Sequence, residues 1–171
     1  MNDSFSKEAF RQLMFHTGIL VMACDGEVHP HEIDALRLAH KQTNYFGGID
    51  FEVELARFVS EVENDTRGAI QGYFEALREA ELDPVQQLQL VELTLRIVYA
   101  DQCVHENEKR FCQMLLRILT IPGPVLEQRF GELPFIAGSS QEKRVADADL
   151  VSALANELSI SEIDNIRVID N

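Results

Sequence analysis

The feature that most constrains this chain is a pair of similar acidic turns, one around Asp25 and the other around Asp101. A valine, a histidine and a glutamate follow each aspartate at the same spacing: Val28, His29 and Glu32 in the first turn, and Val104, His105 and Glu108 in the second. The apolar positions before each turn repeat at the same offset. A match over both a polar turn and its apolar flank indicates duplication of one helix–turn–helix unit. Chance similarity between two amphipathic helix pairs is the alternative.

Helical periodicity dominates the chain on both sides of these turns. Apolar residues recur at spacings of three and four, while capping residues and prolines mark the points where helices begin. The expected helices span roughly residues 5–24, 30–43, 84–100 and 105–119, with others after Asp50, after Asn64 or Asp65, and over 125–130 and 149–158. No segment shows the strict alternation of a strand. The sequence therefore predicts an all-α helical bundle of about seven to eight helices with an internal pseudo-twofold repeat.

A small, polar stretch between Ala137 and Lys143 indicates a boundary. We expect a helical domain over residues 1–136, followed by a linker and a C-terminal helical extension over residues 137–171. The apolar periodicity from Ile160 to Val168 predicts that the C-terminus docks on the rest of the chain. No long apolar run predicts a transmembrane helix, and no signal peptide is visible. Three cysteines without a CxxC spacing favour a reduced, cytoplasmic compartment.

The net charge of −14 bears on the kind of partner that this protein binds. A strongly acidic chain is repelled by phosphates, so direct binding to nucleic acid is not expected. The charge instead favours a protein partner with a basic surface, or cations. The alternative is that the charge serves solubility alone.

The carboxylates of the two turns support two interpretations. Glu32 and Glu108 fall near the start of a helix, where a glutamate accepts the N-cap amide and favours the positive end of the helix dipole. Asp25 and Asp101 can close their turns by accepting backbone amides. If the two units pack about a pseudo-twofold axis, however, these four carboxylates approach one another and can hold Ca²⁺ or Mg²⁺. The sequence is compatible with both helix capping and a cation site.

His29 and His105 occupy the expected N-cap positions, where serine, threonine, aspartate or asparagine is preferred. Together they can extend a carboxylate site toward a transition metal. The alternative is that both are merely exposed. The sequence contains no EF-hand loop, zincin helix, di-iron motif, phosphate-binding loop or nucleophile motif. We therefore expect a protein without enzymatic activity.

The residues of both turns also resemble a known family. Ala23-Cys24-Asp25-Gly26-Glu27-Val28, followed by Glu32, resembles the first signature of the tellurite-resistance TerB-like family, and Ala100-Asp101 with Val104 and Glu108 is similar to the second. The resemblance covers roughly residues 8–130. It implies an all-α bundle with internal pseudo-symmetry, and a cation site at Asp25, Glu32, Asp101 and Glu108. The sequence departs from the family pattern at Gln102 and Cys103, which indicates a degenerate second turn and argues against a symmetric metal site.

The resemblance also implies a function. TerB-like domains are modules of bacterial stress and defence systems, often associated with membrane proteins, and a related domain occurs in a membrane-anchored J-domain co-chaperone. We therefore expect a non-enzymatic module that binds a protein partner, with a divalent cation at the two acidic turns. One alternative is a metal-dependent enzyme that uses the same carboxylates, with His29 or His105 as acid or base. Another is an acidic inhibitor that mimics nucleic acid.

Overall fold

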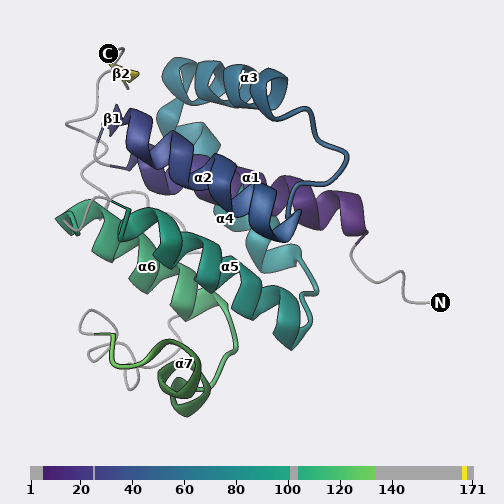
Figure 1. Ribbon diagram of the computed structural model, residues 1–171, viewed down its shortest axis with the longest axis vertical. Helices are drawn as coiled ribbons and strands as arrows, with labels where there is room; N and C mark the ends of the chain where they lie inside the picture. The colour runs from purple at the N-terminus through teal and green to yellow at the C-terminus, as the bar shows by residue number, and fades with distance from the viewer. Residues whose placement is uncertain (1–5, 25, 101–103, 134–166, 169–171) are drawn as a thin grey trace.

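The computed structural model describes residues 6–24, 26–100, 104–133 and 167–168. These residues form seven α-helices: α1 (Lys7–Ala23), α2 (Pro30–Thr43), α3 (Phe51–Asn64), α4 (Thr66–Glu79), α5 (Pro84–Val98), α6 (Glu106–Ile118) and α7 (Gly123–Phe130) (Figure 1). A single parallel pair of two-residue strands accompanies them, β1 (Glu27–Val28) and β2 (Arg167–Val168). The predicted all-α bundle is confirmed. Within these ranges, no helix combines the length and the apolar character that crossing a membrane requires.

The helices begin where the sequence places capping residues. The carboxylates of Asp50, Asp65 and Asp83 each accept a backbone amide three residues later, at 3.3, 2.9 and 2.9 Å. Such a bond satisfies one of the amides that the first turn of a helix leaves without a partner. Pro30 and Pro84 stand at first helical positions, where the missing N–H costs nothing. The predicted starts of α2 to α5 are therefore confirmed, and those of α3 to α5 rest on local hydrogen bonds.

The core lies between the two helices that precede the acidic turns, α1 and α5, which share the largest interhelical contact. From Leu13 to Ala23 almost every residue of α1 is buried, so this helix is central to the bundle. At Gly18, an added Cβ would lie 2.5 Å from Leu36 Cδ1 on α2 and 3.3 Å from Ile97 Cδ1 on α5. The glycine therefore allows three helices to approach one another closely at one point.

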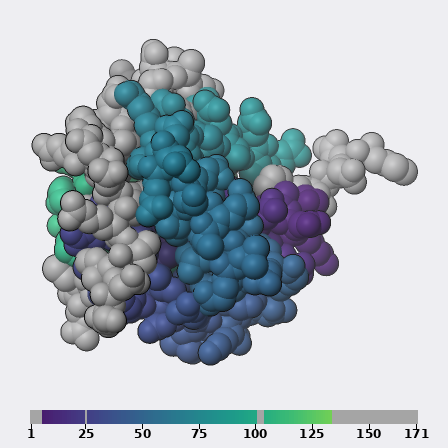
Figure 2. Space-filling view, turned by 90° about the horizontal axis from the view of Figure 1, so that it is seen from above, coloured from purple at the N-terminus to yellow at the C-terminus, as the bar shows by residue number. Residues whose placement is uncertain are grey.

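The arrangement of the helices partly follows the sequence repeat. The α1–α2 and α5–α6 units correspond, and α1 packs on α5 at the centre. The contact between α2 and α5 is more extensive than the equivalent contact between α6 and α1, so the two units are not symmetric in detail. The α3–α4 pair packs on α1, and α7 lies at the opposite end of the bundle from α3 (Figure 1). Seen from above, α2 and α3 lie across one face, and the first residues of α1 emerge beside them (Figure 2).

Two details differ from the sequence prediction. Helix α7 begins at Gly123, two residues before the expected start, because the adjoining prolines suit an N-cap and a first turn. The predicted helix over residues 149–158 lies outside the described residues. The described residues of the C-terminal extension, Arg167 and Val168, are extended rather than helical and pair with β1. At these two residues the expected docking of the C-terminus is confirmed.

Candidate functional site

The first acidic turn joins α1 to β1 and α2. Helix α1 ends at Ala23, and the Cys24 thiol donates to the carbonyl of Val21 at 2.9 Å. Gly26 then adopts a φ of 92°, a conformation that residues with a side chain rarely adopt, and its amide donates to the carbonyl of Ala23. Val28 follows and is completely buried. The backbone is thus fixed on both sides of Asp25, which itself lies outside the described residues.

Glu32 and Glu108 hold equivalent positions in the two turns. Glu32 Oε2 accepts the backbone amide of His29, and Glu108 Oε2 accepts that of His105, both at 2.7 Å. The two glutamates are only 6% and 3% exposed. Each therefore forms the glutamate half of a capping box at the third residue of its helix. The capping interpretation of these two carboxylates is confirmed, and the identical geometry supports the duplication.

The two histidines differ in their surroundings. The His29 side chain is 29% exposed, and its Nε2 lies 3.7 Å from Glu27 Oε2. Its ring stacks on that of His31, with the ring centroids 5.3 Å apart. His105 is exposed at the start of α6. The first turn therefore gathers two imidazoles and a carboxylate on the surface.

The described residues include only part of the predicted cation site. Asp101, like Asp25, lies outside the described residues. In the ranges that are described, no three side chains of His, Cys, Asp or Glu are placed to hold a metal ion together. The donors Glu32, Glu108, His29 and His105 therefore do not form a metal site by themselves. A cation at the turns would need the two aspartates.

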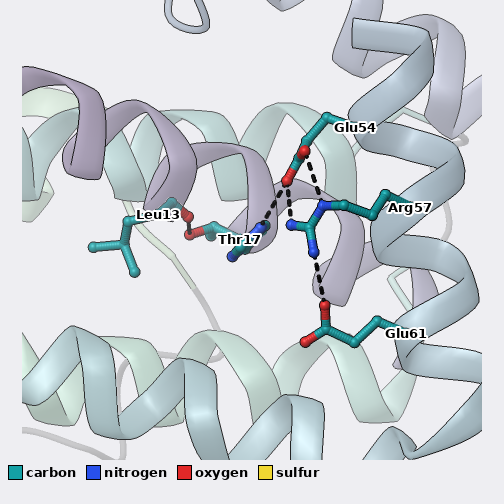
Figure 3. Close-up of polar contacts among 6 residues, drawn as sticks. Leu13, Thr17, Glu54, Arg57 and Glu61 are labelled. Carbon is teal, nitrogen blue, oxygen red and sulfur yellow. Dashed lines mark hydrogen bonds and ion pairs between the residues drawn. The ribbon is translucent and has the colours of Figure 1, made fainter. Parts of the chain in front are cut away.

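A polar cluster that sequence reasoning missed links α1 to α3. His16 Nε2 lies 3.3 Å from Glu54 Oε1, and the His16 ring stacks on Phe58 with centroids 3.9 Å apart and planes 7° apart. Arg57 connects Glu54 to Glu61 along the same face of α3 (Figure 3). Burial lowers the pKa of His16, and the bond to Glu54 opposes this shift. The spacing of the three α3 residues is visible in the sequence, but the participation of His16 is not.

Two of the cysteines, Cys24 and Cys112, lie in the described residues, and both are buried. Neither of them forms a disulfide bond. Burial, followed by the nearby charge of Glu108, raises the pKa of Cys112 to about 12. Because the thiolate is the reactive form, this thiol is inert near neutral pH.

Comparison with known proteins assigns most of the chain to a family. A family model described as "Tellurite resistance protein TerB" matches residues 11–128, which include both acidic turns and extend from α1 into α7. The match covers more than half of the chain and stops short of the C-terminal residues. Searches among curated proteins and among solved structures gave no match.

Proposed function

Because this chain belongs to the TerB family of tellurite resistance proteins, we propose that it is a non-enzymatic protein-interaction module of a bacterial stress-response or defence system. It works in the cytoplasm and binds a protein partner with a basic surface, including a partner within a membrane protein complex. A divalent cation orders its two acidic turns. The observation that carries the proposal is the net charge of −14 over the chain, together with the excess of acidic residues on α3.

Helix α3 shows this imbalance most clearly. It carries four glutamates and a single basic residue, Arg57, which pairs with Glu54 and Glu61. Glu52, Glu61 and Glu63 are exposed on this helix, which lies on the surface in the view from above (Figure 2). Exposed charges of one sign raise the rate at which an oppositely charged partner arrives and favour its correct orientation. This supports a basic partner that approaches the α3 side of the bundle.

The proposed cation rests on the carboxylates of the turns. Their oxygen donors suit Ca²⁺ or Mg²⁺ better than soft transition metals. The capping bonds fix Glu32 and Glu108 at equivalent positions, each seven residues after an aspartate. The proposed ligands are Asp25, Glu32, Asp101 and Glu108, with His29 and His105 as secondary donors.

Charge reversal on α3 tests the protein partner. The tagged full chain and its Glu61→Lys/Glu63→Lys variant would be used to capture proteins from the native host. The variant should lose partners that the unaltered chain retains, and raising the salt concentration should weaken the same partners. The matched control is Glu127→Lys/Glu132→Lys, which changes the net charge equally at exposed positions on and after α7. Equal loss of partners in both variants would contradict a role for α3.

Thermal melting tests the cation. Ca²⁺, Mg²⁺, Mn²⁺ and Zn²⁺ would be added separately to metal-free protein, because a cation that binds only the folded state raises the melting temperature. The rise should be lost in Asp25→Asn/Asp101→Asn. It should persist in Asp34→Asn/Glu75→Gln, which removes two exposed carboxylates elsewhere. If no cation raises the melting temperature of the unaltered chain, the cation proposal fails while the proposed partner remains testable.

A further inference from the structure

The two short strands connect the first acidic turn to residues near the C-terminus. Strand β1 directly follows the first acidic turn and pairs in parallel with β2, near the C-terminus (Figure 1). Glu27 lies opposite Arg167, and Val28 lies opposite Val168. Strand β2 lies outside residues 11–128, so the match to the TerB family does not account for it.

Strand β1 is a short extended segment with one anchored residue. Val28 is completely buried and anchors the strand in the core, whereas Glu27 points outward with its side chain 53% exposed. The extended backbone between them presents N–H and C=O groups that require hydrogen-bond partners. Within the described residues, β2 is the only strand that supplies them. An edge of this kind recognises an extended peptide by strand addition, with the backbone giving affinity and alternate side chains giving specificity.

The register indicates what such a peptide requires. A basic residue lies opposite Glu27, and an aliphatic residue lies opposite the buried Val28. Opposite charges in facing positions favour one register over its neighbours, as do paired β-branched residues. We propose that the β1 edge is a peptide-binding site beside the first acidic turn, and that the C-terminal residues Arg167–Val168 occupy it as an intramolecular ligand. This occupancy depends neither on the proposed partner nor on a cation at the turns.

Amide hydrogen exchange in a shortened chain tests whether Arg167–Val168 occupy the β1 edge. A variant that ends at Ile166 keeps every described helix and lacks β2. The amides of β1 should exchange about fivefold to tenfold faster in this variant, as expected from the loss of about one net hydrogen bond. The His105 amide is the internal control, because it makes the same capping bond in the second turn. Unchanged exchange at both Glu27 and Val28 would overturn the proposal.

A peptide added in trans tests specificity. A synthetic peptide of residues 160–171 should restore the slow exchange of β1 in the shortened chain, in a saturable manner. The same peptide carrying Val168→Pro, which lacks one backbone N–H, should not restore it, nor should a scrambled peptide. Failure of the unaltered peptide at millimolar concentration would contradict a peptide-binding edge. In the full chain, protection of β1 that disappears on dilution would show that β2 comes from a second copy, and the intramolecular assignment would be wrong.

Charge reversal adds an independent check on the register. Glu27→Lys in the full chain should speed exchange at Val28, because two basic residues would then occupy facing positions in the strand pair. Adding Arg167→Glu to the same chain should restore slow exchange. If the double variant exchanges as fast as Glu27→Lys alone, the proposed facing of these two positions is wrong.

Discussion

Replacing Glu32 by alanine tests how the acidic turns stabilise the fold. The change removes the Oε2 atom that accepts the His29 amide at 2.7 Å. A hydrogen bond to a charged group contributes about 1.5–3 kcal/mol. Glu32 is only 6% exposed, so water replaces the lost acceptor poorly. We expect Glu32→Ala to lower the free energy of unfolding by about 2 kcal/mol.

Glutamine at the same position separates the hydrogen bond from the charge. Glu32→Gln retains an oxygen acceptor, and a neutral hydrogen bond is roughly half as strong as a charge-assisted one. This variant should therefore lose about 1 kcal/mol. Urea denaturation with linear extrapolation measures both variants. In a chain of this size, a loss of 2 kcal/mol lowers the melting temperature by about 4–8 °C.

The second turn allows the same substitutions to be tested independently. Glu108 makes the same bond at 2.7 Å, so its alanine and glutamine variants should rank in the same order. Glu106→Ala is the control, because Glu106 is an exposed residue of the same first turn, and the change should stay within about 0.5 kcal/mol. All measurements would be made in a chelator, so that no cation contributes. Alanine variants as stable as the unaltered chain would refute the capping argument, and glutamine variants as unstable as alanine would assign the effect to charge.

Three further measurements test the surrounding structure. Burial holds the pKa of His16 below its ordinary value of 6.5, so the unfolded state binds more protons and the free energy of unfolding should fall as the pH drops below 6.5. His16→Gln should weaken this dependence in urea denaturation between about pH 7 and pH 5.5. Tyr73→Phe removes the 2.8 Å bond to Thr17 but leaves the Thr17 hydroxyl donating to a backbone carbonyl, so it should cost about 1 kcal/mol by the same assay. In a variant that keeps only Cys112, a thiol reagent should react at the rate of unfolding, because burial raises the pKa of this thiol to about 12, and rapid labelling would contradict the buried position.

The sequence predicts the helices well because their boundaries depend on local bonds. Asp50, Asp65 and Asp83 each cap an amide only three residues away, so a single stretch of sequence contains both partners. The capping roles of Glu32 and Glu108 are readable for the same reason. The repeat then relates the two turns to each other without any knowledge of packing.

Features that depend on distant packing were not predictable from the sequence. Two residues of strand leave no periodicity to detect, so β1 and its pairing with Arg167–Val168 could not be found. The contact between His16 and Glu54 joins residues of α1 and α3, and it exists only because these helices pack together. The cation at the turns stays a prediction, since Asp25 and Asp101 lie outside the described residues.

The two turns differ in the residues that a ligand would contact. Both turns share the glutamate cap, so this feature belongs to the duplicated fold. In the first turn, His29 lies near Glu27, which begins a strand paired with the C-terminal residues. In the second turn, His105 is exposed and no strand is found among the described residues. A ligand that contacted only the shared glutamate cap would bind both turns equally well. A ligand that pairs with β1 must bind the first turn in preference to the second.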